Sequence, residues 1–108
     1  MIQASFERNG QGQLCGFWVE DHGEDFVCAA VSALVINAIN SLEAFTNEEI
    51  FCDAQEEEGV VRFALPSVRA GGANHDVDLL LSSLELGLSA IAEEYPEQVC
   101  LLEAETYE

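Results

Sequence analysis

Residues 21–42 read DHGEDFVCAAVSALVINAINSL, and this stretch decides how the rest of the chain is organised. Its apolar residues recur at steps of three and four, which is the period of one face of an α-helix. They are Val27, Val31, Leu34, Val35, Ala38, Ile39 and Leu42. Asp25 precedes this run, in a position typical of a helix N-cap. The pattern therefore predicts a helix that begins near residue 25 and ends at about Phe45.

Strand patterns lie on both sides of this helix, and a second helical pattern follows later in the chain. Strands are indicated by short apolar segments, the first with period-two alternation. Asn9–Gly10 is a strong hairpin signal between the first two strands. The expected strands are 2–7, 14–19, 50–55, 60–65 and 98–104, and the expected second helix is 75–94. Residues 66–74 are expected to form a loop, and 106–108 a frayed tail.

The resulting order is ββαββαβ, with hairpins in place of regular βαβ alternation. It predicts an α+β fold in two layers, with a mixed or antiparallel sheet of about five strands and two helices. At 108 residues, we expect a single domain, 1–108. The strand 14–19 (LCGFWV) is apolar on both faces, which predicts that both are covered. Phe17 and Trp18 must point to opposite faces, so one belongs to the core and the other is available to a partner or a groove.

The charge balance is strongly acidic. The chain has 21 acidic residues against 3 basic ones and a formal net charge of −18. This argues against direct binding to nucleic acid, which needs lysine and arginine for its phosphates. It suits a basic protein partner or substrate attracted by opposite charge. A solvated acidic surface that only confers solubility is the alternative interpretation.

The cysteine and histidine spacing indicates no metal site and no disulfide framework. Cys15, Cys28, Cys52 and Cys100 are irregularly spaced, without a CxxC pair. The three other than Cys28 fall inside strand patterns and are interpreted as core residues. No cofactor is indicated, because the chain has neither a glycine-rich phosphate loop nor any lysine. We find no apolar stretch long enough for a bilayer and no signal peptide, so we expect a cytoplasmic protein with no membrane partner.

Cys28 is the candidate nucleophile. It falls in the first turn of the predicted helix, where free backbone N–H groups and the positive end of the helix dipole favour an anion. A thiol in such a position is shifted toward thiolate, the reactive form. His22 precedes it by six positions, and an imidazolium close by would favour the thiolate further. A Cys–His pair of this kind supports nucleophilic catalysis with His22 as general acid and base.

The same residues carry a family resemblance. His22 followed by Asp25 to Leu34 (DFVCAAVSAL) is similar to the His…VCAAVSAL motif of the ribosomal-processing cysteine proteases. The resemblance extends from Met1–Ile2 to the closing YPEQV at 95–99. It implies a cysteine endopeptidase that removes the N-terminal extension of a large-subunit ribosomal protein, and a homodimer. It also supports Cys28 and His22 as the catalytic pair.

Supporting roles near the pair stay open. Asp25 either caps the helix or orients His22. Ser32 lies one turn after Cys28, on the same helical face, and either lines the site or bonds back to the carbonyl of Cys28. Asp21 either pairs with His22 or is an ordinary loop acid. The glycine-containing segments 23–24 and 70–73 are expected to form the walls of the site.

We therefore expect a cysteine-type peptidase that acts on the precursor of a basic large-subunit ribosomal protein, without a metal or cofactor. The alternative is a non-enzymatic acidic module that binds a basic ribosomal or assembly partner. The short segment between His22 and Cys28 is the feature that favours this alternative.

Overall fold

The computed structural model describes residues 1–20, 25–55, 59–102 and 105–106. Its strands are β1 (Ile2–Arg8), β2 (Leu14–Glu20), β3 (Phe51–Gln55), β4 (Val60–Ala64), β5 (Val99–Leu101) and β6 (Glu105–Thr106). Its helices are α1 (Asp25–Phe45), α2 (Pro66–Arg69) and α3 (His75–Glu94). The two long helices and five main strands are those that the sequence predicts.

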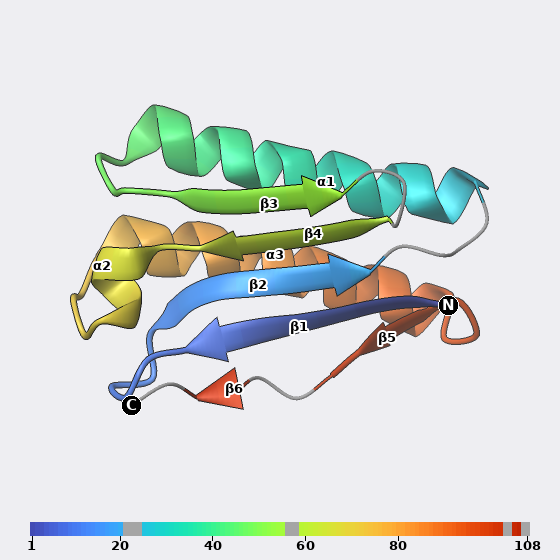
Figure 1. Ribbon diagram of the computed structural model, residues 1–108. Coiled ribbons are helices and arrows are strands. Elements are labelled where there is room, and N and C mark those ends of the chain that lie inside the picture. The colour runs from blue at the N-terminus through green and yellow to red at the C-terminus, as the bar shows by residue number, and fades with distance from the viewer. Residues whose placement is uncertain (21–24, 56–58, 103–104, 107–108) are drawn as a thin grey trace.

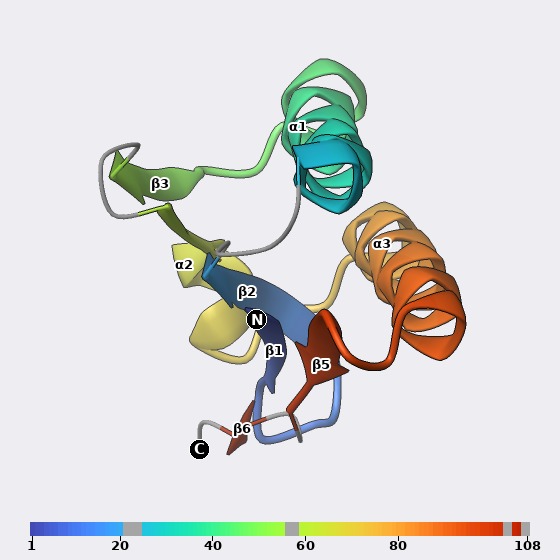
Figure 2. The ribbon, with the colours of Figure 1, turned by 90° about the vertical axis from the view of Figure 1, so that its right-hand side faces the viewer.

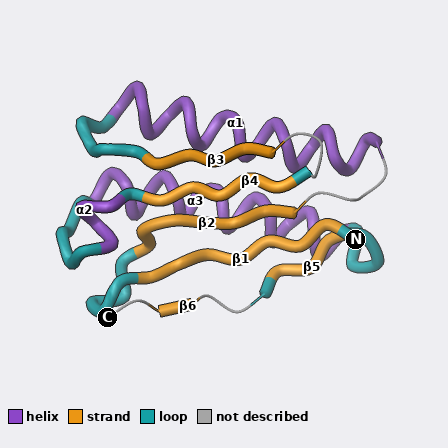
Figure 3. Tube along the Cα trace, in the orientation of Figure 1, coloured by secondary structure: helices purple, strands orange, loops and turns teal. Residues whose placement is uncertain are grey.

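The strands form one mixed sheet in the order β3-β4-β2-β1-β5, and the short β6 also pairs with β1. The pairs β1–β2, β2–β4 and β3–β4 are antiparallel, whereas β5 and β6 run parallel to β1. Helices α1 and α3 lie together behind the sheet as a second layer (Figures 1 and 3). The predicted two-layer α+β fold is confirmed, and the strand order is new information.

The core lies between this helical layer and the sheet. The buried side of α1 consists of Val27, Val31, Val35, Ala38 and Leu42, and that of α3 of Val77, Leu81, Leu84 and Leu88. They pack against inward side chains of the strands, including Ile2, Phe6 and Phe17. The rings of Phe17 and Phe63 stack at a centroid distance of 5.0 Å across β2 and β4. The helical periodicity thus identified the core-facing residues correctly.

Two elements differ from the expectation. Residues Pro66–Arg69 were expected to be loop but form the short helix α2. Proline at its start has the φ angle of a helix already fixed, and its missing N–H would have no partner in a first turn. A four-residue helix is too short for any periodic signal. Thr106, expected in a frayed tail, belongs to β6 because parallel pairing with β1 extends the sheet.

Asn9 connects the β1–β2 turn to α2. Its side chain is fully buried, and its Nδ2 donates to the carbonyls of Val68 (2.8 Å) and Gly72 (3.3 Å). Its Oδ1 accepts from the N–H groups of Gln11 and Gln13. The connection is therefore a five-residue turn organised by a buried amide, not a minimal Asn-Gly hairpin. Gly12, at φ +84°, supplies its left-handed residue.

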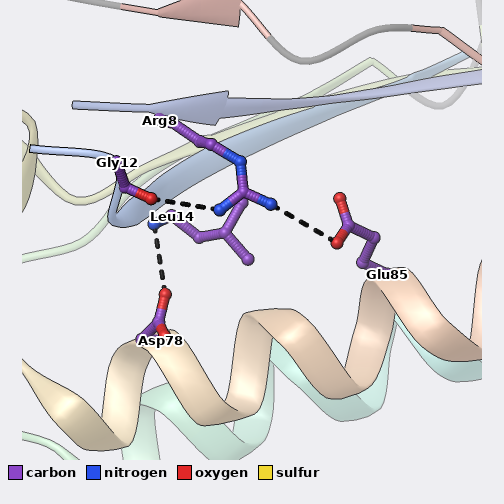
Figure 4. A network of polar contacts seen from close by, with 5 residues as sticks. All are labelled: Arg8, Gly12, Leu14, Asp78 and Glu85. Carbon is purple, nitrogen blue, oxygen red and sulfur yellow. Dashed lines mark hydrogen bonds and ion pairs between the residues drawn. The ribbon is translucent and has the colours of Figure 1, made fainter. Parts of the chain in front are cut away.

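A polar network joins the same turn to α3 (Figure 4). Arg8 donates from Nη1 to the Gly12 carbonyl at 3.1 Å, and its Nη2 lies 3.6 Å from Glu85 Oε1 on α3. The N–H of Leu14 donates to Asp78 Oδ1 at 3.3 Å. These contacts hold Arg8 on the helical side of the sheet.

The opposite face of the sheet has no long helix over it (Figures 1 and 2). Phe17 is buried on the helical side, whereas Trp18 points to this open face and is only half-buried. The expectation that both faces of β2 are covered is therefore wrong. The prediction counted Trp18 as an apolar residue that must be covered. An indole has a polar N–H group and tolerates partial exposure beside polar neighbours, so no helix over Trp18 is required.

Among the described residues, one helix is long and apolar enough to cross a membrane by length and composition alone, contrary to the expectation from the sequence. It is Phe26–Phe45 of α1, with a mean hydropathy of 1.6 over its most apolar window, of which 28% is buried. The buried fraction is the stripe that packs on the sheet. We interpret α1 as a core helix, because this stripe already has its partners within the fold.

Candidate functional site

A groove runs along α1, on the helical side of the sheet. The sheet extends beyond α1 through β3 and part of β4, so inward-facing residues of these strands have no helix above them (Figure 2). The resulting groove has a volume of about 450 Å³. Its wall on α1 is formed by Cys28, Val31, Ser32, Val35, Ile36 and Ile39. Its strand side is formed by Val19, Cys52, Ala54, Gln55, Gly59, Val60 and Val61.

Cys28 stands at one end of this groove. It is the fourth residue of α1, half-buried, and lines the groove together with Ser32 one turn further along. The thiol is therefore accessible from a lined cavity, and it lies near the helix start, where the first backbone N–H groups have no partner within the helix itself. A carbonyl placed against Cys28 would bring its developing negative charge close to the same N–H groups. This arrangement can support attack of a thiolate on an acyl carbon.

The other predicted site residues are only partly described. His22 and Asp21 lie outside the described residues. Asp25 is the first residue of α1, whereas an N-cap precedes the first helical residue, and its side chain lies outside the described part. The predicted wall segment 23–24 is also outside it. Of the four predicted site residues (His22, Asp25, Cys28 and Ser32), Cys28 and Ser32 are thus the two that share the groove within the described part of the chain.

The second predicted wall, residues 70–73, is wrong. This segment follows α2, and the Gly72 carbonyl accepts from Asn9 beside the β1–β2 turn. Figure 1 shows α2 at the left end of the sheet, whereas α1 begins at the right end. No residue of 70–73 lines the groove. Glycine content suggested flexibility, but only the strand order could reveal which end of the sheet the segment reaches.

The remaining cysteines differ in their surroundings. Cys15 is buried as expected, and its pKa is raised, first by burial and then by Glu7, against an opposing effect of Arg69. Cys52 is exposed, so its assignment to the core is wrong. Its pKa is also raised, by partial burial of the thiol and then by the nearby carboxylates of Glu43 and Asp53. The reason for its exposure is that β3 is the uncovered edge strand.

In the described part of the chain, there is no metal site at this groove, and His75 does not line it. Within residues 1–20, 25–55, 59–102 and 105–106, no cluster of three His, Cys, Asp or Glu residues could hold a metal ion. His75 begins α3, is exposed and lines a separate polar hollow beside the β1–β2 turn.

The sequence did not predict that residues of β3 and β4 line the groove next to α1. Residues such as Ala54 and Val61 were expected only as parts of strands 50–55 and 60–65. The alternation of β3 and β4 does predict which residues share a face. That this face lies beside α1 follows from the strand order, which a single sequence does not reveal.

A thiol near a helix start, facing an apolar groove on an α+β sheet, fits a cysteine-type peptidase, and the comparisons with known proteins show that the chain is of this class. The model of the family "Cysteine protease Prp" matches residues 1–100, so the chain belongs to this family. The ribosomal processing cysteine protease Prp of Bacillus subtilis is 28% identical over 92% of this chain and 94% of its own length. Its counterpart from Staphylococcus aureus is 29% identical over 94% of this chain and 97% of its own length.

Solved structures show the same fold. The crystal structure of SMU.848 from Streptococcus mutans is 30% identical, covers 98% of this chain and 95% of its own, and superimposes with a TM-score of 0.82. The Prp protease of S. aureus in complex with a substrate peptide is 25% identical, with coverage of 95% and 99% and a TM-score of 0.84.

Proposed function

We propose that this chain removes the N-terminal extension of a basic large-subunit ribosomal protein, with Cys28 as nucleophile and His22 as general acid and base. The observation that carries the proposal is the position of Cys28, at the start of α1 and at one end of the apolar groove. The relatives are named ribosomal processing proteases, and the S. aureus protein has been solved with a substrate peptide. Their names support a ribosomal substrate for this chain as well.

The groove favours an extended peptide with apolar side chains near the scissile bond. Among the described residues, those that line it carry no charge, and its α1 wall extends for three turns, from Cys28 to Ile39. A chain lying along this wall would bury aliphatic side chains against Val35 and Ile36, which supplies binding free energy in proportion to the apolar area covered. The same contact would hold the scissile carbonyl next to the thiol.

The proposed reaction follows from these groups. The Cys28 thiolate attacks the scissile carbonyl carbon, and the backbone N–H groups at the start of α1 stabilise the oxyanion. The tetrahedral intermediate collapses to an acyl-enzyme as protonated His22 gives its proton to the leaving amine. Water, deprotonated by His22, then releases the new carboxylate and restores the thiolate. In this scheme Asp25 caps the helix and Ser32 lines the cleft next to the nucleophile.

Replacement of the nucleophile tests the mechanism. We expect Cys28→Ser to keep the fold and to lower cleavage of a precursor peptide by a factor of about 1,000 or more, because a hydroxyl lacks the preformed thiolate. Cys52→Ser is the matched control, since this second thiol lines the same groove. It should cleave at nearly the wild-type rate. Cleavage by Cys28→Ser at the wild-type rate would refute the assignment.

We further propose a cytoplasmic homodimer that captures its basic substrate by charge. The net charge of −18 supports electrostatic capture, and exposed apolar residues on the two long helices, such as Phe45 and Leu79, support self-association. Rising salt should slow substrate association but strengthen the dimer, because it screens both the attraction and the repulsion between like copies. Stopped-flow on-rates and sedimentation at low and high salt measure both. An on-rate that is flat with salt would contradict capture by charge.

A further inference from the structure

The open face of the sheet carries a second hollow, of about 500 Å³, on the opposite side from Cys28. Strand register places two rows of side chains side by side on this face. One row is Ser5, Trp18, Arg62 and Asp53, and the next is Glu7, Gly16, Ala64 and Phe51. The two central residues of the second row are the smallest available, so the sheet backbone itself forms the floor between taller neighbours. Figure 1 looks onto this face.

The floor cannot be filled by a larger residue at its centre. A Cβ added to Gly16 would lie 2.5 Å from the backbone carbonyl oxygen of Phe63 on β4. The rim is apolar where it projects furthest, with Phe51 55% exposed and Leu102 44% exposed. The half-buried indole of Trp18 completes the apolar part of the lining. The hollow is therefore built into the strand pairing and has the width to accept a side chain.

The charge of the hollow is opposite to that of the molecule. The chain has three basic residues, and two of them, Arg62 and Arg69, line this hollow. Among the described lining residues, Glu7 supplies the one carboxylate. The third, Arg8, is held on the helical side by Gly12 and Glu85. Within the described part of this strongly acidic chain, the open-face hollow is thus the cavity that is lined by two guanidinium groups.

The polar groups of the lining are incompletely paired within the described part of the chain. Arg69 Nη2 lies 3.4 Å from Glu7 Oε2, an ion pair, yet this buried oxygen accepts no hydrogen bond from any described residue. Arg62 is exposed, and its cross-strand neighbour Asp53 forms no ion pair with it. The hollow therefore offers the exposed guanidinium group of Arg62 as a donor at its edge. Glu7 Oε2 is itself buried next to Arg69, so it takes no part in binding a ligand from the hollow.

We propose that this hollow docks an acidic peptide segment of a partner protein. A carboxylate of the segment pairs with Arg62, and an apolar side chain covers Trp18 and the Gly16–Ala64 floor. Charge complementarity selects this partner, because a basic segment finds carboxylates all over the surface, whereas an acidic one finds guanidinium groups here. The site lies on the other face of the sheet from Cys28, so it is separate from the peptidase groove and does not depend on the proposed cleavage.

Trp18 is the one tryptophan of the chain, so its fluorescence reports directly on the hollow. The probe is a capped peptide of sequence Ser-Glu-Phe-Glu-Ser, and its counterpart has glutamine in both glutamate positions. We expect a saturable blue shift with the acidic peptide. Arg62→Gln should weaken binding about tenfold, because it removes a charge-assisted hydrogen bond. Arg8→Gln, which changes the net charge equally on the helical side, should weaken it less than about twofold, the part due to long-range charge.

Four results would overturn the proposal. They are the lack of a saturable shift with the acidic peptide, equal binding of the glutamine peptide, an equal loss in Arg8→Gln, and a Trp18 blue shift that grows with protein concentration without peptide, which would show that a second copy covers Trp18. Circular dichroism of both variants verifies folding. If Arg62→Gln is unfolded, Arg62→Lys replaces it, and it should still bind more weakly than Arg8→Lys because lysine lacks the planar fork.

Discussion

The two faces of the sheet carry hollows of similar volume, about 450 and 500 Å³, with different chemistry. The groove along α1 is mostly aliphatic, and the thiol of Cys28, which we propose as the nucleophile, lies at its end near the helix start. The hollow on the open face is lined by two arginines, a glutamate and aromatic rings. The groove along α1 exists because the sheet extends past this helix through β3. The open-face hollow exists because two small residues, Gly16 and Ala64, are cross-strand neighbours on β2 and β4. The comparison shows that one sheet can provide two independent cavities by two different structural means.

The open-face hollow depends on Gly16, and its replacement gives the largest expected effect. Gly16→Ala should lower the free energy of unfolding by about 3 kcal/mol, because the new Cβ would push β2 away from the Phe63 carbonyl of β4. Gly12→Ala is the control. A Cβ there meets nothing within 4 Å, so only its φ of +84° opposes the change, at a cost of about 1 kcal/mol. Urea unfolding measures both, and equal losses would show that the close β2–β4 approach is unimportant.

The two thiols of the α1 groove sharpen the contrast within one cavity. Cys28 lies near the start of a helix, a position that favours the thiolate form of a cysteine. For Cys52, in contrast, burial and two carboxylates raise the pKa of the thiol. A raised pKa lowers the thiolate fraction at neutral pH, so Cys52 should react slowly at pH 7 and faster as the pH rises. We expect iodoacetamide to modify Cys28 about tenfold faster than Cys52 at pH 7, with a smaller ratio at higher pH. Peptide mapping by mass spectrometry gives both rates, and equal rates at pH 7 would remove the case for an activated Cys28.

The aliphatic wall of the groove gives the smallest of these effects. Ile36 is 56% exposed and lines the groove, and Leu86 on α3 is 73% exposed and does not. Ile36→Glu should lower kcat/KM for a precursor peptide about fivefold, through lost apolar contact. Leu86→Glu adds the same charge and should leave kcat/KM unchanged. If both variants lose activity equally, the effect comes from added charge, and the substrate does not lie along α1.

The sequence by itself determined the elements and the chemistry of single positions. Backbone geometry fixes the periods of helix and strand, so residues 27–42 disclosed their buried face before any tertiary contact was known. The same local rule placed Phe17 and Trp18 on opposite faces and Cys28 near a helix start. The motif around Cys28 gave the family, and the family model across residues 1–100 confirmed it.

Tertiary structure alone decided where these elements meet. An alternating strand can pair with several partners, and nothing local chooses among them; that choice depends on the packing of the whole chain. It made β3 the edge strand, which exposed Cys52 and opened the groove beside Cys28. It also brought Arg69 from α2 to the strands that carry Glu7 and Arg62. Both hollows result from strand pairing between distant parts of the chain. The periodicity of the sequence therefore predicts which residues share a face of a helix or strand, but it does not predict that they come together to line a cavity.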